Sequence, residues 1–503
     1  MKRALGLIVI LALLGAAPPP KPLPPVQIQR SDFTAAVHRF VQAYAAHRPA
    51  PGEARSQIHR AYDEAIYFNL TSRADQAIQR LNQLCDVLDP AQTNAGVRSL
   101  VRSLQVQVSP PVGWRNRPGI MRIRIARMYR VDTPLPVSLR LVIRADTPDQ
   151  KVYLDEPVKI EESGPPFALT RAGPEAPMGK YLIELVGPDS THYPVDRWTV
   201  TEVSFDVLRQ GNAIQSLQLK PEDPPTADAL VALTTRNSLL SDRPDENNSA
   251  QYLADPLELG RAVQSETEYM VMGKNPYTDR TGDWWRGIQS GAMQIPARVY
   301  APERARTRAA MPLLIALQGG GGDESSFMEE VGAGKLKKLA DDLGFIVVAP
   351  NSFWLRNNLA AFNSIVDSMS LTYAIDKSRV YVLGHSSGAG MAAQMVGPNA
   401  HKVAAMVLIS GGDFAEVTRL PRTLMYSGGV DPFFTPAQAQ SAAGAARKAG
   451  LPVELRTVND AGHLLLADDV LEEAVKWMLS PPANAGPQEA LQPGPPASPA
   501  ASQ

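Results

Sequence analysis

Cysteine is the scarcest residue in this chain of 503 amino acids, which contains one, Cys85. A single cysteine cannot form a disulfide within the chain. It lies in an apolar pattern with helical spacing, where a cysteine usually acts as a small buried hydrophobic side chain. An excess of charge of one sign is also missing, since 50 Lys and Arg face 51 Asp and Glu. This balance, without a basic stripe carrying interleaved aromatic residues, predicts no nucleic-acid partner.

Metal and cofactor signatures are absent from the sequence as well. No cluster of histidines, cysteines and carboxylates has the spacing of metal ligands. The one glycine run, residues 319–322, has no Gly-Lys-Ser/Thr ending and no Gly-x-Gly-x-x-Gly pattern, which argues against a phosphate-cradling loop. We therefore expect no metal and no cofactor.

The chain begins with an apolar run too short to span a bilayer. Lys2 and Arg3 precede this run, residues 4–14, and the small residues 15–17 follow it. The pattern predicts a secretory signal peptide over residues 1–17 and an exported protein, periplasmic or extracellular, with no stable membrane insertion after cleavage. A retained anchor is the alternative, because Pro18 is a poor residue at the cleavage site.

Composition and periodicity predict a multidomain chain. Its 44 prolines cluster at joints and ends. The predicted parts, in order, are a Pro-rich linker (18–30), a helical region (31–104), a β-sandwich-like domain with period-two alternation (105–220), a helical or loop linker or lid (221–290), a mainly parallel doubly wound α/β domain (291–480) and a disordered Pro/Ala-rich tail (481–503).

A Gly-x-Ser-x-Gly pattern at residues 384–388 is the strongest functional signal. An apolar strand-like run precedes it and a helix-like segment of small residues follows. This order predicts a sharp strand-to-helix turn that exposes Ser386 at the carboxyl end of the strand, as in a nucleophile elbow. Ser386 is therefore the predicted nucleophile.

Two histidines follow Ser386, and they differ in their surroundings. His463 lies in a loop after the strand-like run 453–458, where a general base of this fold belongs, whereas His401 precedes an apolar run and is predicted to be solvated. Asp431 follows a buried-looking strand and is preferred as the acid. Asp413, one strand earlier, is the alternative; Asp460 is too close to His463 along the loop to lie beneath the imidazole.

The glycine run after the strand-like residues 312–317 is a candidate oxyanion loop, because glycines let backbone N–H groups approach a substrate closely. The N–H of Ser387, just after the nucleophile, is the expected second donor. Trp354, Phe433 and Phe434 are candidates for an apolar acyl or aryl pocket, or for ordinary loop packing.

Residues 292–479 resemble an α/β-hydrolase. They are most similar to secreted esterases grouped around polyhydroxybutyrate depolymerases, feruloyl and acetylxylan esterases and dienelactone-hydrolase-like enzymes. The run from Asp376 through the elbow to Ala392, with its Asp-x-x-Arg-Val-Tyr lead-in and Gly-Met-Ala helix start, carries the resemblance. One departure weakens the subgroup assignment: Gln318 stands where the family commonly has histidine.

The resemblance implies roles for five positions of the C-terminal domain. By match to the family pattern, the nucleophile, acid and base are Ser386, Asp431 and His463, and the oxyanion donors are the N–H groups of Gly320 and Ser387.

The strands expected in the domain are 313–318, 345–350, 380–384, 404–410, 422–427 and 453–458, with 294–299 at an edge. Helix-like segments lie between most of them, which predicts a mainly parallel sheet. All proposed site residues then follow the carboxyl ends of strands, where such sheets place their chemistry.

The predicted function is an exported serine esterase that cleaves a small-molecule or polymeric carboxylic ester through an acyl-enzyme. A serine peptidase of the same fold is one alternative, although the N-terminal half lacks the repeats of a propeller. A binding or scaffold protein with a spent hydrolase domain is the other.

Overall fold

The computed structural model describes residues 27–89, 94–109, 112–114, 120–162, 166–172, 176–201, 223–240, 249–356, 358 and 360–481. The predicted signal peptide, most of the Pro-rich linker and nearly all of the C-terminal tail lie outside these residues, so the three assignments stay predictions. None of the helices within the described ranges is long and apolar enough to span a membrane.

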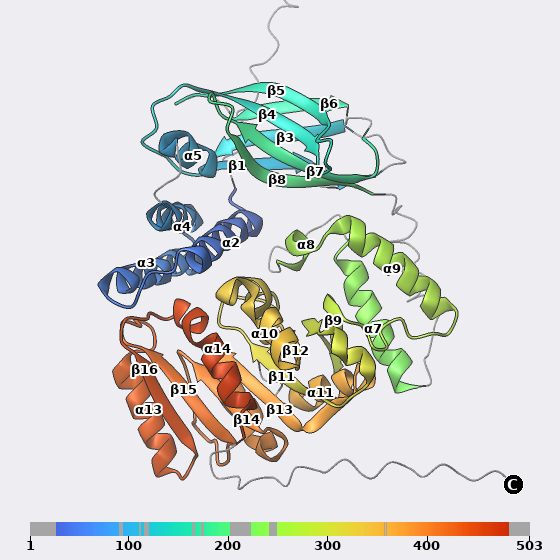
Figure 1. Cartoon of the computed structure of the whole chain (residues 1–503), viewed down its shortest axis with the longest axis vertical. Helices are drawn as coiled ribbons and strands as arrows, with labels where there is room; N and C mark the ends of the chain where they lie inside the picture. Colours follow the sequence, from blue (N-terminus) through green and yellow to red (C-terminus); the bar gives the residue numbers. More distant parts are fainter. Residues whose placement is uncertain are drawn as a thin grey trace, which may run out of the picture.

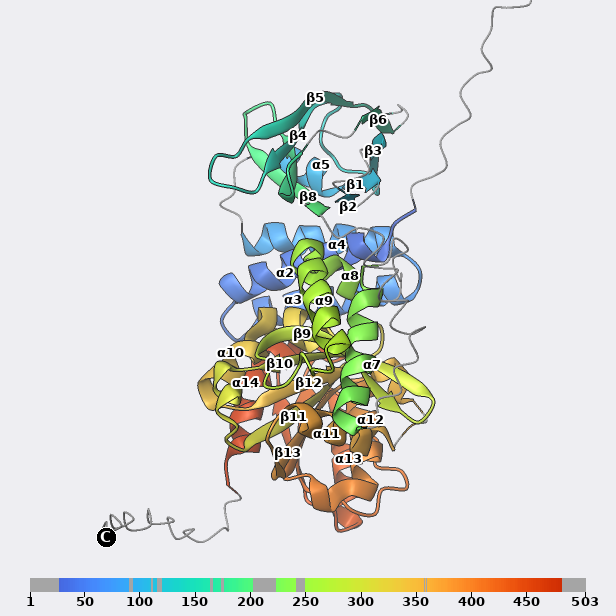
Figure 2. The same ribbon diagram turned by 90° about the vertical axis from the view of Figure 1, so that its right-hand side faces the viewer.

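The elements form three tiers along the long axis of the molecule (Figures 1 and 2). Two small sheets lie at one end, a layer of helices lies in the middle, and a large sheet covered by helices lies at the other end (Figure 1). The N-terminal helices therefore lie directly against the large C-terminal sheet unit.

The middle tier is built from amphipathic helices. They are α2 (Arg30–Ala46), α3 (Glu53–Leu70) and α4 (Ala74–Leu88), followed by the short α5 (Ala95–Arg102). The apolar stripe of α2 faces inward, and Phe40 stacks on Tyr62 of α3 with ring centroids 4.5 Å apart. Cys85 of α4 is buried in the same core. Leu465, from far along the chain, completes this core, so the helical layer is packed onto the C-terminal unit.

Two sheets of the upper tier share one apolar core. The core is made of the inward-facing side chains of these strands. Ile123, Leu141 and Ile183 are examples, and all three are fully or almost fully buried. The three-stranded sheet has the order β1 (Leu104–Ser109), β3 (Ile120–Arg127), β6 (Phe167–Ala172), and the five-stranded sheet has the order β2 (Val112–Trp114), β8 (His192–Thr201), β7 (Gly179–Val186), β4 (Val137–Ala145), β5 (Val152–Ile160).

The large sheet has eight strands in the order β16-β15-β14-β13-β11-β12-β10-β9. Neighbours from β16 to β12 pair in parallel, and β10 pairs antiparallel with both β12 and β9. The bounds are β9 (Gly282–Ser290), β10 (Met293–Ala301), β11 (Met311–Leu317), β12 (Ile346–Pro350), β13 (Ile375–His385), β14 (Ala405–Ile409), β15 (Arg422–Gly428) and β16 (Val453–Val458).

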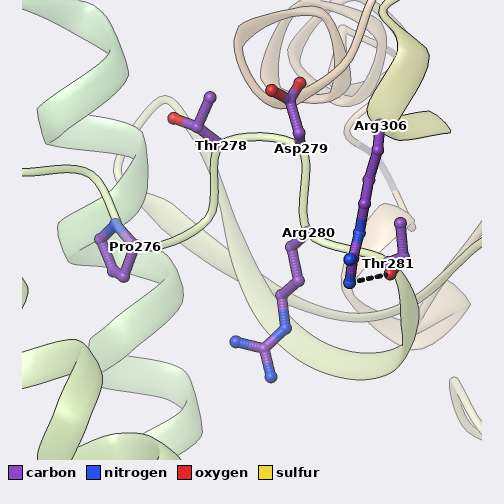
Figure 3. Close-up of a pocket in the computed structure, with 6 residues that line it drawn as sticks. All are labelled: Pro276, Thr278, Asp279, Arg280, Thr281 and Arg306. Carbon is purple, nitrogen blue, oxygen red and sulfur yellow. Dashed lines mark hydrogen bonds between the residues drawn. The ribbon is translucent and has the colours of Figure 1, made fainter. Parts of the chain in front are cut away.

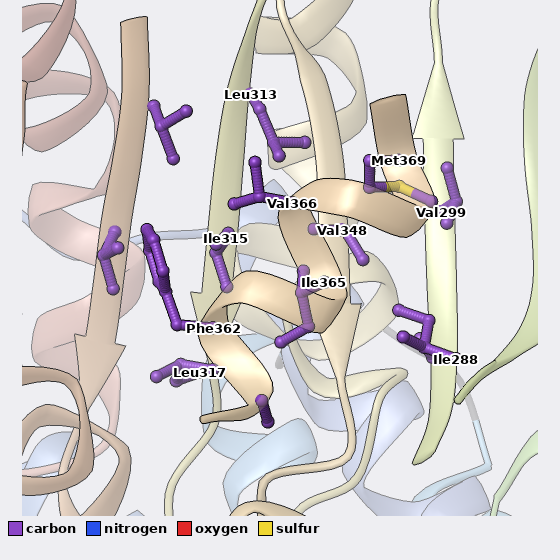
Figure 4. Close-up of a cluster of buried hydrophobic side chains, with 14 of the residues drawn as sticks. Ile288, Val299, Leu313, Ile315, Leu317, Val348, Phe362, Ile365, Val366 and Met369 are labelled. Atoms are coloured by element: carbon purple, nitrogen blue, oxygen red, sulfur yellow. The ribbon is translucent and has the colours of Figure 1, made fainter. Parts of the chain in front are cut away.

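Helices cover both faces of this sheet because its central strands are apolar on both sides. The covering helices are α10 (Lys335–Leu343), α11 (Ala361–Thr372), α12 (Ser387–Val396), α13 (Pro436–Lys448) and α14 (Leu465–Leu479), with short turns η1 (Glu303–Thr307), η2 (Ser326–Glu330), η3 (Val331–Gly334), η4 (Ser352–Leu355) and η5 (Gly397–Lys402). Figure 4 shows one face, where Phe362, Ile365 and Met369 of α11 lie over β11, β12 and β10. The mainly parallel, doubly wound sheet of the resemblance is present.

The edge of this sheet differs from the prediction. Strand β9, not residues 294–299, is the edge strand, and it lies in a segment predicted to be a helical or loop linker or lid. Its sequence hides it, since Trp284, Trp285 and Arg286 are consecutive and all buried, so no polar–apolar alternation marks a strand. Three helices precede β9: α7 (Pro224–Ser238), α8 (Ala250–Leu253) and α9 (Pro256–Val271). Buried side chains of α7 and α9 belong to the hydrophobic core of the large sheet, so these two helices do not form a separate lid.

Candidate active site

Ser386 occupies the turn between β13 and α12 with φ +55° and ψ −124°. A positive φ costs a non-glycine residue about 1–3 kcal/mol, a strain that persists only where the surroundings enforce it. The pattern's glycines allow this close packing: a Cβ on Gly384 would lie 2.6 Å from the carbonyl oxygen of Gly388, and a Cβ on Gly388 would overlap the carbonyl oxygens of Leu317 and Gln318. The turn therefore has the geometry that the sequence predicts.

The three residues predicted as nucleophile, base and acid lie within hydrogen-bonding distance of one another. His463 Nε2 is 2.7 Å from Ser386 Oγ, and His463 Nδ1 is 2.8 Å from Asp431 Oδ2 and 3.0 Å from Oδ1. The His463 and Asp431 residues are only 6% and 3% exposed. An ionised Asp431 can only accept, so Nδ1 carries the ring proton and Nε2 is free to accept the proton of the Ser386 hydroxyl.

Asp431 is fixed in place by the loop that follows β15. Its Oδ1 accepts the backbone N–H groups of Phe433 (2.8 Å) and Phe434 (2.9 Å). These bonds orient the carboxylate so that it faces the imidazole of His463. The two oxygens of this carboxylate therefore face three N–H groups, those of Phe433, Phe434 and the His463 ring.

The other candidates of the sequence stand apart from His463. Asp413, the alternative acid, accepts the N–H of Ala415 at 2.9 Å and the side-chain amide of Gln394 at 3.3 Å, as a turn residue does. His401 is exposed in the short turn η5. Asp460 forms an ion pair with Arg55 of α3.

His385 is a residue of the site that the sequence did not predict. Its ring is buried, and burial is the main cause that lowers its pKa to about 4. The neutral ring donates from Nε2 to the backbone carbonyl of His463 at 3.1 Å, and Ser410 Oγ donates to the same oxygen at 2.9 Å. His385 therefore helps to hold the loop of His463, and only its place before Ser386 in the sequence could have suggested this.

The glycine run after β11 lies beside Ser386. A Cβ on Gly319 would lie 2.9 Å from the Cβ of Ser386, and a Cβ on Gly320 would lie 3.7 Å from Ser387 Oγ. Ser387 is the first residue of α12, and the first N–H groups of a helix have no acceptor within the helix. The two predicted donor residues, Gly320 and Ser387, thus lie next to each other at Ser386.

Apolar side chains from two tiers lie near His463 and the glycine run. The ring of Phe433 meets that of His463 edge to face, with centroids 5.1 Å apart, and Tyr67 of α3 is 6.2 Å from Phe433. Leu70, also on α3, reaches within 3.0 Å of where a Cβ of Gly321 would lie. Phe433 and Tyr67 are 44% and 45% exposed, so they can contact a bound molecule. Trp354, another predicted pocket residue, contacts Phe353.

A shallow pocket of about 510 Å³ lies away from Ser386 (Figure 3). Its lining includes Arg280 and Thr281, which directly precede β9, and Arg306 of η1. Because β9 begins opposite Ala301, and β10 runs antiparallel to β12, this pocket lies at the amino edge of the parallel strands. Ser386, Asp431 and His463 lie at the carboxyl edge. Within the described ranges, no group of three or more His, Cys, Asp and Glu is placed to hold a metal ion.

No family model and no curated protein matches the chain. Solved structures to which part of it is similar include an S-formylglutathione hydrolase from Agrobacterium tumefaciens, at 16% identity over 39% of this chain and 94% of that one, with a TM-score of 0.32. Another is an S-formylglutathione hydrolase from Staphylococcus aureus, at 16% identity over 40% of this chain and 99% of that one, with a TM-score of 0.34. A third is a mutant of the feruloyl esterase module of Clostridium thermocellum complexed with sinapinate, at 13% identity over 39% of this chain and 88% of that one, with a TM-score of 0.33. The strand order and the turn at Ser386 give the C-terminal unit an α/β-hydrolase fold.

Proposed function

We propose that the chain is a serine esterase that hydrolyses carboxylic esters at Ser386. One observation carries the proposal: the continuous hydrogen-bonded line from Ser386 Oγ through the imidazole of His463 to the carboxylate of Asp431. This line lies at a strained strand-to-helix turn on the carboxyl edge of a doubly wound sheet, where such folds place their reactive groups.

In the proposed reaction, His463 Nε2 takes the hydroxyl proton while Ser386 Oγ attacks the ester carbonyl. The N–H groups of Gly320 and Ser387 bind the oxyanion that forms. The C–O bond to the alcohol breaks, His463 returns the proton to the leaving oxygen, and an acyl-serine remains. Water, deprotonated by His463, then attacks the acyl carbonyl. The bond from that carbonyl to Ser386 Oγ breaks, His463 returns the proton to Oγ, and the carboxylic acid leaves.

Each partner of His463 has a separate part in this mechanism. Asp431 holds the imidazole in the tautomer that leaves Nε2 free, and it stabilises the imidazolium that forms. His385 and Ser410 hold the backbone of His463 through its carbonyl. The base therefore starts each cycle in position, which reduces the entropy lost on reaching the transition state.

The proposal is tested with p-nitrophenyl acetate and butyrate, assayed beside a panel of peptide amides. We expect the wild type to cleave the esters and Ser386→Ala to be folded but essentially inactive. Ser378→Ala, at the exposed start of the same strand β13, is the matched control and should retain full activity. Cleavage of the amides at rates equal to or above those of the esters would favour the peptidase alternative, and a wild type inactive on both would favour the scaffold alternative.

The export predicted from Lys2, Arg3 and the apolar run that follows stays a prediction. Fractionation of producing cells, with mass spectrometry of the N-terminal peptide of the recovered protein, tests it. A protein that begins near residue 18 in the exported fraction is the expected result.

A further inference from the structure

The loop that carries His463 is held by a helix from the opposite end of the chain. Asp63 of α3 is 1% exposed, and its carboxylate accepts two consecutive backbone N–H groups. Oδ2 accepts from His463 at 2.8 Å, and Oδ1 accepts from Leu464 at 3.0 Å. Asp63 precedes His463 by 400 residues, so this contact belongs to the packing of the tiers and not to the hydrolase fold alone.

The preceding amide of the loop is held by the same helix. The N–H of Gly462 donates to Nδ1 of His59 at 2.9 Å, and burial lowers the pKa of His59 to about 3. The neutral ring therefore carries its proton on Nε2 and donates it to Tyr44 Oη, which is 2.9 Å away. Tyr44 in turn donates to Asp469 at 3.2 Å. Three successive backbone amides, 462 to 464, thus end on side chains of α3.

The loop fits the helix closely at its start as well. A Cβ on Gly462 would overlap the carboxylate of Asp63, so glycine lets the two segments approach. Asp460 accepts the backbone N–H of Gly52 at 2.6 Å and Nε of Arg55 at 2.9 Å. The contact therefore extends from residue 460 to residue 464, on both sides of the predicted base.

The helical layer also contacts the oxyanion loop. Arg30, the first residue of α2, donates to the carbonyl oxygen of Gly321 at 3.2 Å and to the carboxylate of Asp323 at 3.2 Å. The helical layer is thereby connected to both loops that flank Ser386.

We propose that Asp63 is a positioning residue for the general base: it fixes the backbone of His463 so that Nε2 stays aligned with Ser386. The inference rests on the proposed function, since it needs His463 to act as the base. The hydrolase domain itself holds the carbonyl and the imidazole of His463, through His385, Ser410 and Asp431. Asp63 holds the backbone N–H of His463, which these three residues do not contact. Without it, the buried amide of His463 and the partly buried amide of Leu464 lose their acceptor, which favours a shifted loop.

The test is Asp63→Asn, which keeps the size of the side chain. Asparagine can accept one of the two N–H groups, but its own NH₂ then faces the other donor. We expect kcat for p-nitrophenyl butyrate to fall about 10- to 100-fold, because a displacement of roughly 1 Å costs that much in a reaction with aligned groups, while KM stays near that of the wild type. Glu64→Gln is the matched control, since Glu64 is the next residue of α3 and is exposed.

Titration to completion with a fluorophosphonate separates positioning from simple stabilisation. It counts the molecules that hold a reactive serine, so kcat is expressed per titrated site. If Asp63 only stabilised the protein, Asp63→Asn would reduce the number of titrated sites and leave kcat per site unchanged, and this result overturns the proposal. A wild type that neither reacts nor hydrolyses esters would instead contradict the proposed function.

Asp460→Ala decides the question if Asp63→Asn does not fold. Asp460 lies at the outer end of the contact between α3 and the loop of His463. Its substitution leaves the amides of His463 and Leu464 bonded to Asp63. We expect a several-fold lower kcat per site with KM unchanged, because the loop loses its bonds to Gly52 and Arg55. An unchanged kcat per site refutes the role of α3 in holding the base.

Discussion

Substitution of Asp431 by asparagine tests the acid of the proposed triad. Asparagine has one acceptor oxygen, and the N–H groups of Phe433 and Phe434 both point to the position of Oδ1. The oxygen is therefore expected to stay on these two donors, which turns the NH₂ group toward Nδ1 of His463. Facing a donor, Nδ1 gives up its proton and becomes the acceptor, and the ring proton moves to Nε2.

In that tautomer Nε2 cannot accept the proton of Ser386 Oγ, although the heavy atoms have hardly moved. Loss of the correct tautomer lowers kcat by about 10⁴ in triads of this kind, which corresponds to roughly 5 kcal/mol of transition-state stabilisation. We expect that loss for Asp431→Asn, with KM little changed and the unfolding temperature near that of the wild type.

The assay is ester hydrolysis by Asp431→Asn and by Asp413→Asn in parallel. Asp413 also follows a strand of the sheet but lies in a local turn, so its substitution should leave kcat within a few-fold of the wild type. The assignment of Asp431 as the acid is refuted if Asp413→Asn lowers kcat more than Asp431→Asn does, or if Asp431→Asn keeps more than about a tenth of the wild-type activity.

Two further predictions concern stability and substrate binding. Burial raises the pKa of Asp468 to about 7, so the folded protein holds this proton more tightly than the unfolded chain, and stability falls as the pH rises from about 4 to about 7. Asp468→Asn should therefore raise the free energy of unfolding, measured in urea, by at most ~4 kcal/mol at pH 8 and should hardly change it at pH 4. An equal gain at the two pH values would contradict the raised pKa of Asp468. Tyr67→Ala removes an exposed ring beside Phe433 and should raise KM for p-nitrophenyl butyrate several-fold at nearly constant kcat, whereas Tyr269→Ala, an exposed tyrosine on α9, should change neither. An unchanged KM for Tyr67→Ala would remove α3 from the substrate site.

The strand-to-helix turn could be predicted because its determinants are local. The glycines at 384 and 388, the preceding apolar strand and the small residues of α12 are contiguous in the sequence. The positions of Asp431 and His463 were also accessible, since each follows the carboxyl end of a strand. Between Asp431 and Asp413 the sequence could only prefer one, because both follow buried strands; the structure brings Asp431 to the imidazole.

What the sequence did not predict depends on contacts between distant segments. Asp63 and His59 lie on an ordinary amphipathic helix, and no local pattern connects them with amides 400 or more residues later. Strand β9 was missed because its consecutive buried residues break the period of two. His385 was missed because the residue before the nucleophile is variable in the elbow pattern, so its role becomes visible only with its partner, the carbonyl of His463.

Covalent labelling identifies the nucleophilic serine of the protein. The intact protein is treated with a fluorophosphonate, digested, and the modified residue is located by mass spectrometry. We expect one adduct, on Ser386, formed quickly in the wild type and absent from Ser386→Ala, with hydrolysis of p-nitrophenyl esters lost in proportion to labelling. Esterase activity that survives complete labelling, or an adduct on a different serine, would contradict the assignment of Ser386 as the nucleophile.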